Sequence, residues 1–177
     1  MTPRRARQPM HAKAGDNRLG CVSCHSAHRF DTKKAAVEAC VGCHRDEHTQ
    51  AYERSPHYTL WKKELAGEAA AGTGVSCATC HLPREEYRQP GASAKRILVQ
   101  HNQNDSLRPN EKMIRPVCMS CHGLAYSIDA LADSVLVSKN FLGQPRTHVK
   151  SVDMVAQRIK ELGDKRQTKS GVGEDTK

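Results

Sequence analysis

All eight cysteines of this chain stand in four copies of one five-residue pattern, Cys-x-x-Cys-His. The copies begin at Cys21, Cys40, Cys77 and Cys118, and no cysteine lies outside them. Each copy sets two thiols three residues apart and places an imidazole directly after the second thiol. Such a set can hold one planar group by two covalent bonds and one metal ligand. A chain of 177 residues with four such sites is expected to fold around the groups that they hold.

The pattern is the attachment signature of c-type haem. The two thiols match the vinyl groups of the porphyrin in separation and form thioethers with them, and the imidazole binds the iron. The sequence therefore predicts four covalently bound c-type haems. The expected thioether residues are Cys21, Cys24, Cys40, Cys43, Cys77, Cys80, Cys118 and Cys121, and the expected proximal iron ligands are His25, His44, His81 and His122.

Two other uses of the cysteines are open to a sequence of this kind. Four Cys-x-x-Cys pairs could build two zinc sites with four thiolates each, or the eight thiols could form four disulfides. Neither use requires a histidine after every second cysteine, and the chain has only ten histidines in all. The repeated histidine therefore favours haem.

The composition fits a chain that wraps cofactors. Aromatic residues make up 4% of the chain and hydrophobic residues 37%, so a core of side chains alone would be thin. Runs of Val and Thr long enough for strands are absent. We expect a mainly α-helical fold with much irregular structure, in which short helices and loops surround four haems with little or no sheet.

The formal net charge of +9 would ordinarily suggest nucleic acid or an anionic membrane surface as a partner. Each haem, however, carries two propionates, and much of the Lys and Arg excess can neutralise them. We therefore expect no binding of nucleic acid. The apolar stretches are interrupted by charges within a few residues, so no membrane span is expected.

Covalent haem attachment of this kind takes place outside the cytoplasm. We therefore expect an exported protein, extracellular or periplasmic. The first five residues, Met-Thr-Pro-Arg-Arg, lack the apolar region of a signal peptide, so we expect a mature or trimmed form.

Six histidines lie outside the four patterns and are candidates for the second axial position of the irons. A haem with two histidine ligands is suited to electron transfer, whereas an open position can bind small molecules. His28 is expected on the same short helix as His25. His28 and His48 follow attachment histidines too closely to close the same haem, so each would serve a neighbour. Pro56 could aim the adjacent imidazole inward. The candidate distal ligands are His57, His101, His28, His48 and His11.

His148 is expected to be a surface residue instead. Apolar residues recur at steps of three and four from Val149 to Leu162 and predict an amphipathic helix over about 147–163, which Gly163 would end. His148 would lie in its first turn.

The chain divides by composition into a basic N-terminal arm at 1–18, a single tetrahaem domain at 19–163 and a polar, mobile tail at 164–177. The first two patterns are so close in sequence that their haems should be tightly packed. The other expected segments are a helical turn at 34–40, a small-residue linker at 64–74 and a helix at 124–137. A loop is expected from the third pattern to about 110, and the polar stretch 101–105 belongs to it.

The order of these residues resembles that of the multihaem family of hydroxylamine oxidoreductase and its octahaem relatives. The resemblance runs from His11 to about Leu131 through Cys21-x-x-Cys24-His25-x-x-His28-x-Phe30, Ala39-Cys40-x-x-Cys43-His44, His48-x-Gln50-x-x-Glu53-x-Ser55-x-His57, Cys77-Ala78-Thr79-Cys80-His81-Leu82-Pro83, His101-Asn102 and Arg115-x-x-Cys118-x-x-Cys121-His122.

The resemblance implies that the haem matching His25 is the catalytic, open-sided one, with an Asp-His pair above it. Here the matching segment, from His44 to His48, is one residue shorter, with Glu47 directly before His48. His48 or His11 could then close that iron. The enzyme alternative is a small nitrite- or hydroxylamine-active cytochrome, with Asp46, His48 and Tyr52 near an open site at the His25 haem.

A tetrahaem chain of this kind is also similar to small extracellular cytochromes that polymerise into haem filaments. In those proteins one haem can take its sixth ligand from the adjacent subunit, a role that suits the arm carrying His11. The expected function is electron transfer along four closely spaced haems, either in a filament or as a discrete periplasmic carrier. The expected partners are redox-partner cytochromes or an extracellular acceptor, together with other copies of the chain.

Overall fold

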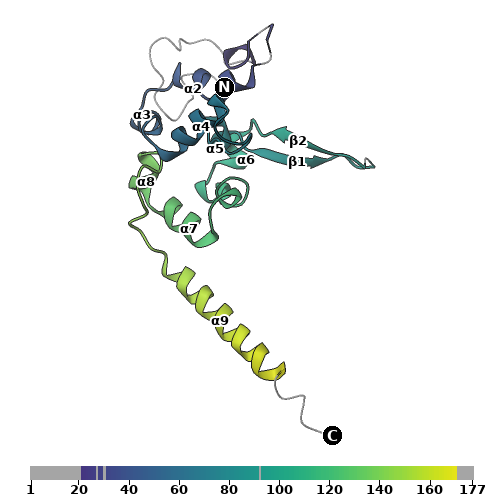
Figure 1. Cartoon of the computed structure of the whole chain (residues 1–177), viewed down its shortest axis with the longest axis vertical. Helices are drawn as coiled ribbons and strands as arrows, with labels where there is room; N and C mark the ends of the chain where they lie inside the picture. Colours follow the sequence, from purple (N-terminus) through teal and green to yellow (C-terminus); the bar gives the residue numbers. More distant parts are fainter. Residues whose placement is uncertain (1–20, 27, 30, 92, 171–177) are drawn as a thin grey trace.

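The computed structural model describes residues 21–26, 28–29, 31–91 and 93–163, and the helical backbone of 164–170. About half of the chain is helical, with one two-stranded sheet and much irregular structure, as the sequence predicts. The helices are short apart from the last one, which extends away from the rest of the molecule (Figure 1). The elements in chain order are η3 (Cys21–Ser23), α1 (Thr32–Ala36), α2 (Glu38–Val41), α3 (Glu47–Tyr52), α4 (Pro56–Ala66), α5 (Cys77–His81), β1 (Arg84–Arg88), β2 (Lys95–Val99), α6 (Gln103–Ser106), η4 (Asn110–Met113), η5 (Cys118–Ser120), α7 (Leu124–Ala132), α8 (Ser134–Ser138) and α9 (Lys150–Ser170).

Side-chain caps fix where the N-terminal helices begin. Asp31 accepts a hydrogen bond from the Lys34 amide at the start of α1, and Asp46 does the same for α3. Ser55 caps α4, whose first residue is Pro56, a position where its missing N–H costs nothing. The helical turn expected at 34–40 is present but is divided into α1 and α2 at Val37.

The linker expected at 64–74 is helical in its first part, because α4 continues to Ala66. Gly67 ends the helix in the left-handed conformation, with φ at 76°. Further on, the Gly74 amide donates a hydrogen bond to the Glu64 carboxylate, so the segment returns to pack against α4.

The prediction of a long loop after the third pattern was wrong over the first half of that segment. Strands β1 and β2 form an antiparallel hairpin there, with Arg84 opposite Val99 and Arg88 opposite Lys95. A glycine with φ at 82°, Gly91, lies in the connection. The expected loop at 101–105 likewise contains α6, which Asn102 caps. Both elements are short, so the sequence carries little periodicity from which to recognise them.

The C-terminal helices also differ from their expected bounds. The helix expected at 124–137 is divided into α7 and α8 at Asp133, whose carboxylate caps α8 by accepting from the Val135 and Leu136 amides. Helix α9 runs through Gly163 to Ser170, so the helix end predicted at Gly163 is wrong. One interior glycine costs about 1 kcal/mol relative to alanine, which good helix formers on both sides can offset. Residues 171–177 and the basic arm lie outside the described residues.

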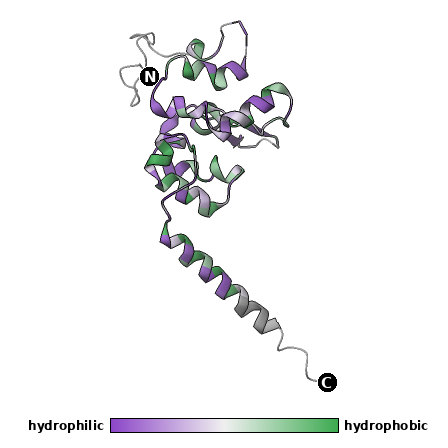
Figure 2. Ribbon diagram, turned by 60° about the vertical axis from the view of Figure 1, so that its left-hand side comes forward, coloured by the Kyte–Doolittle hydropathy of each residue, from purple (hydrophilic) through white to green (hydrophobic). Residues whose placement is uncertain are grey.

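The core formed by side chains is small, as the composition predicts. The described residues with buried apolar side chains include Val37, Ala51, Tyr52, Met113, Ala130 and Leu136. Large apolar residues are exposed on the hairpin and along α9, where apolar and polar segments alternate (Figure 2). Within the described part of the chain no helix combines the length and apolar character that crossing a membrane requires.

Candidate functional site

The structure brings six histidine rings together in three pairs. His25 faces His101 with ring centroids 6.5 Å apart, His81 faces His48 at 6.0 Å, and His122 faces His57 at 6.2 Å. Every pair joins one histidine of a Cys-x-x-Cys-His pattern to one of the remaining histidines. The two members come from different segments and lie far apart in sequence, so the pairs are products of tertiary structure.

The separations fit two axial ligands of one iron. A metal–imidazole nitrogen bond is about 2 Å long, and with about 1.2 Å from each nitrogen to its ring centroid, two rings on opposite sides of a metal ion lie about 6 Å apart. The three observed separations agree with this value. A haem iron takes its other four ligands from the porphyrin, so a histidine pair is the protein contribution that such a site needs.

Two of the paired histidines are held in the neutral form that can bind a metal. Burial, followed by the nearby His48 and His44, lowers the pKa of His81 to about 4. Burial, followed by the neighbouring His122, also lowers the pKa of His57. A neutral imidazole keeps a lone pair on one nitrogen for coordination.

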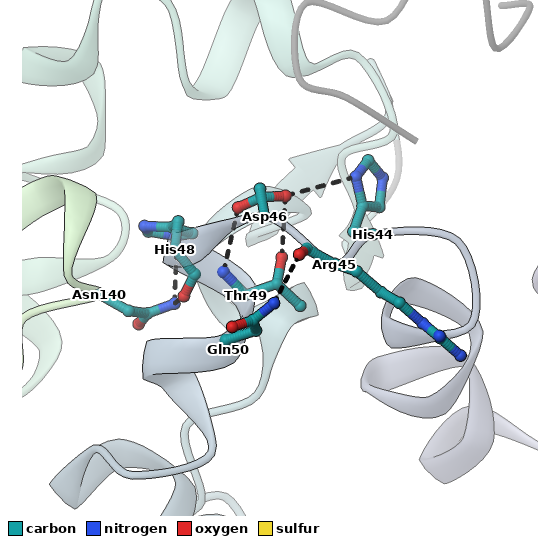
Figure 3. A network of polar contacts seen from close by, with 7 residues as sticks. All are labelled: His44, Arg45, Asp46, His48, Thr49, Gln50 and Asn140. Atoms are coloured by element: carbon teal, nitrogen blue, oxygen red, sulfur yellow. Dashed lines mark hydrogen bonds and ion pairs between the residues drawn. The ribbon is translucent and has the colours of Figure 1, made fainter. Parts of the chain in front are cut away.

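The His48 ring is held by the end of α8. Its Nδ1 lies 2.7 Å from the carbonyl oxygen of Val137, and its Nε2 lies 3.1 Å from Nδ2 of Asn140. The same Asn140 amide donates to the backbone oxygen of His48 at 3.2 Å. Figure 3 shows Asn140 beside His48. Asp46, the residue before α3, caps the helix by accepting a hydrogen bond from the Thr49 amide.

His101 is oriented in a similar way. Its Nδ1 lies 3.0 Å from the carbonyl oxygen of Val99 at the end of β2, so the hairpin that the sequence did not predict sets the direction of this ring. His101 is itself exposed. A backbone carbonyl beside Nδ1 is a common means of fixing the tautomer of a metal-binding histidine.

His44, the histidine of the second pattern, has a different environment. Its Nδ1 lies 4.0 Å from the Asp46 carboxylate, and Figure 3 shows the two side chains facing each other. Among the described residues no second imidazole packs against the His44 ring. His28 is exposed on a turn after η3, not on a helix as expected, between the bridged residues Ser26 and Arg29. His11 lies outside the described residues.

The thiols of successive patterns are neighbours. Burial raises the pKa of Cys24, and the nearby Cys40 and Cys43 add to the effect, so the first two patterns are adjacent. A hydrogen bond from the second pattern to the third, between Cys40 and Cys77, raises the pKa of the Cys77 thiol.

The third and fourth patterns are also neighbours, through Cys80 and Cys118. Burial raises the pKa of Cys80 to about 12, and the nearby Cys118 contributes. All eight cysteines lie in the described part of the chain, and no two of them form a disulfide. Within the same residues no three His, Cys, Asp or Glu side chains gather as a metal cluster.

Aromatic residues support the His57–His122 pair. Tyr126 stacks on the His122 ring with centroids 4.8 Å apart, and Phe141 packs edge-on against His57 at 6.3 Å. The sequence reasoning missed both. Tyr126 is four residues after His122, a spacing that could have indicated contact across the start of α7, whereas Phe141 carries no local signal.

The residues of the enzyme alternative have other contacts. Asp46 caps α3, and His48 faces His81. The Tyr52 hydroxyl donates to the carbonyl oxygen of Val75 at 2.8 Å, and burial raises the pKa of this phenol. The ring that faces His25 is that of His101.

His148 is the surface residue that the sequence predicts. It precedes α9, and its two ring nitrogens lie 2.7 Å from Asp129 and 2.8 Å from Asp153. These bonds connect α9 to α7.

The basis for inferring a function is therefore the three histidine pairs and the chain of neighbouring thiols. Comparison with models of protein families, with curated proteins and with solved structures finds no match for this chain.

Proposed function

We propose that the protein is an exported multihaem c-type cytochrome that carries electrons along a row of four covalently bound haems. The observation that carries the proposal is the pairing of attachment and surplus histidines at 6.0–6.5 Å. Haem supplies one-electron redox chemistry when bound. The resemblance of the sequence to multihaem cytochromes points the same way.

The chain would hold each of the four haems in the same way. The two cysteines of a pattern attach the porphyrin, and the following histidine binds the iron. His101, His48 and His57 would provide the second axial ligand to the irons of His25, His81 and His122. Two fixed imidazoles keep the coordination the same in both oxidation states, which is the requirement for fast electron transfer.

The neighbouring thiols support a continuous row. Cys24 lies near Cys40, the thiols of Cys40 and Cys77 are hydrogen-bonded, and Cys80 lies near Cys118, so the expected attachment points follow one another in sequence order. Electrons entering at either end would pass through the groups in turn. Redox-partner cytochromes or an extracellular acceptor would exchange electrons with the ends.

The iron of His44 would take its sixth ligand from outside the three pairs. His28, His11 and a histidine of another copy are the candidates. The last possibility would join copies into a filament. Exposed apolar residues on the projecting hairpin and on α9, including Ile97 and Ile159, favour association between copies.

The closest competing activity is nitrite or hydroxylamine chemistry at an open His25 haem. The ring of His101 opposite His25 supports electron transfer over this reaction. Rapid cyanide or nitrite binding to a high-spin haem would reverse that preference.

The decisive experiment is expression with export in a host that attaches c-type haem. We expect a red protein with a Soret band and a polypeptide mass increased by four haems. A double variant with Ser at Cys77 and Cys80 should retain three haems. Colourless exported protein with the mass of the bare polypeptide would end the proposal.

Filament formation is tested separately by negative-stain microscopy of concentrated holoprotein. Filaments are expected at low salt and high concentration. Dispersed particles across all salt and protein concentrations would leave the discrete periplasmic carrier.

A further inference from the structure

We infer that Asn140 is a positioning residue that competes with iron for Nε2 of His48, which makes His48 the most easily displaced of the three paired distal ligands. The inference rests on the proposed function, since it needs an iron at His81. It follows from contacts that distinguish His48 from the other two distal histidines.

The contacts define the tautomer of His48. The backbone oxygens of His48 and Val137 can only accept hydrogen bonds. The atom of Asn140 that lies 3.2 Å from the His48 oxygen is therefore the amide nitrogen, and Nδ1 of His48, 2.7 Å from the Val137 oxygen, carries the ring proton. Nε2 then has the lone pair, and it accepts from the same Asn140 amide at 3.1 Å.

That lone pair is the one that an iron would need. One nitrogen lone pair cannot serve both a metal and a hydrogen-bond donor, so binding to iron requires loss of the Asn140 bond. When the iron bond opens, the amide is in position to take up Nε2 again. The end of α8 thus orients His48 through Val137 and stabilises its dissociated form through Asn140.

Asn140 is held in place independently of Nε2. It follows α8 in the left-handed conformation with φ at 49°, which asparagine adopts more readily than most residues. Its second hydrogen bond, to the His48 backbone, is unaffected by what Nε2 binds. Phe141, also left-handed, packs against His57.

The other two distal histidines lack this competitor. Nδ1 of His101 faces the Val99 carbonyl, which fixes the tautomer in the same way as in His48. Within the described residues, however, no side chain donates to Nε2 of His101 or to the ring of His57. The three pairs therefore have similar ring separations, and of their distal histidines only His48 has, among the described residues, a side chain that donates to its Nε2.

The test uses carbon monoxide uptake by the reduced holoprotein, because this ligand binds only after a distal histidine dissociates. The variant is Asn140→Gly. Glycine tolerates a positive φ and has no side chain that could donate to Nε2. We expect uptake at the His81 haem to slow about fivefold, the factor that corresponds to one neutral hydrogen bond.

The opposite sign is expected if Asn140 only holds the segment together, because a loosened His48 would leave the iron sooner. Faster or unchanged uptake in Asn140→Gly would therefore overturn the inference. In a His48→Ala background, Asn140→Gly should have no effect on the rate. Asn104→Ala, a change at an exposed asparagine in α6, is the matched control and should leave uptake unchanged.

The two proposals fail in different ways. Absence of the Soret band would refute the proposed function before uptake could be measured. Four attached haems with an uptake rate that does not slow in Asn140→Gly would refute the role of Asn140 alone.

Discussion

The ring of His48 in α3 faces the ring of His81 at the end of α5, with centroids 6.0 Å apart and an interplanar angle of 78°. His81 belongs to the third Cys-x-x-Cys-His pattern, whereas His48 follows the second. A histidine near one attachment site thus faces a different one, as the close spacing of His44 and His48 predicts. Because His48, His57 and His101 each face the histidine of a different pattern, each can be replaced and tested separately.

Replacing His48, His57 or His101 by Ala should convert one low-spin haem to high-spin and leave the other haems unaffected. Each variant removes one axial ligand from one iron. Electron paramagnetic resonance of the oxidised holoprotein measures the change directly. The matched control is His148→Ala, which removes an imidazole outside the pairs and should leave every low-spin signal. A high-spin signal in that control, or none in the three variants, would contradict the pairing.

Ser55→Ala should lower the free energy of unfolding by about 1 kcal/mol, the usual value of an N-cap. The Ser55 side chain is buried, accepts from the Tyr58 amide at 3.2 Å and donates to the Tyr52 carbonyl at 2.7 Å. Urea unfolding followed by far-ultraviolet circular dichroism measures the loss. Ser138→Ala, at an exposed position, should change stability by less than about 0.5 kcal/mol. Equal effects of the two changes would argue against the cap.

Gly74→Ala should destabilise the contact between α4 and the segment before α5. A Cβ at this position would lie 2.7 Å from the Glu64 carboxylate and 3.1 Å from the backbone of Trp61. Overpacking of this kind costs about 1–3 kcal/mol. Thermal unfolding provides the measurement. Gly123→Ala meets nothing within 4 Å and should be neutral, so equal losses in both variants would show that the close approach is not the cause.

The connection between α9 and α7 should weaken as the pH rises. The hydrogen bonds that the charged ring donates to Asp129 and Asp153 raise the pKa of His148 above its ordinary value, because both carboxylates stabilise the charged ring. The contribution of His148 to stability is complete below about pH 6.5, its pKa in the unfolded state. It is lost as the pH rises through the pKa of the folded state. Nuclear magnetic resonance of labelled His148 gives the titration. A His148 titration midpoint at or below about pH 6.5 would contradict its hydrogen bonds with Asp129 and Asp153.

The same connection should also weaken in acid. Hydrogen bonds, first from the Val149 amide and then from His148, lower the pKa of Asp129. A group with a lowered pKa contributes above its unfolded value, about 3.9, and loses that contribution as the pH falls through the folded value. Asp129→Asn should therefore remove the acid limb and return the His148 midpoint toward its ordinary value. An unchanged midpoint would show that Asp129 does not set it.

Local patterns in the sequence predicted the helical character and the sparse core correctly. They failed where short elements or single glycines decide the outcome, as in the β1–β2 hairpin and the continuation of α9 through Gly163. Periodicity needs more than one turn or a few alternations to be recognised, and five-residue strands with mixed charge offer neither. The surface position of His148 followed from its place beside an amphipathic helix.

The sequence alone determined which residues can hold a group, since the two thiols and the imidazole of each pattern are adjacent in the chain. It also supplied the five candidate distal histidines, of which three lie in pairs, His28 is exposed, and His11 is outside the described residues. Only the tertiary structure decided that His101 faces His25, that His48 faces His81 and that His57 faces His122. The reason is that these rings are set by contacts with distant segments. The end of α8 that orients His48 lies about ninety residues away in sequence, a distance over which no local pattern carries information.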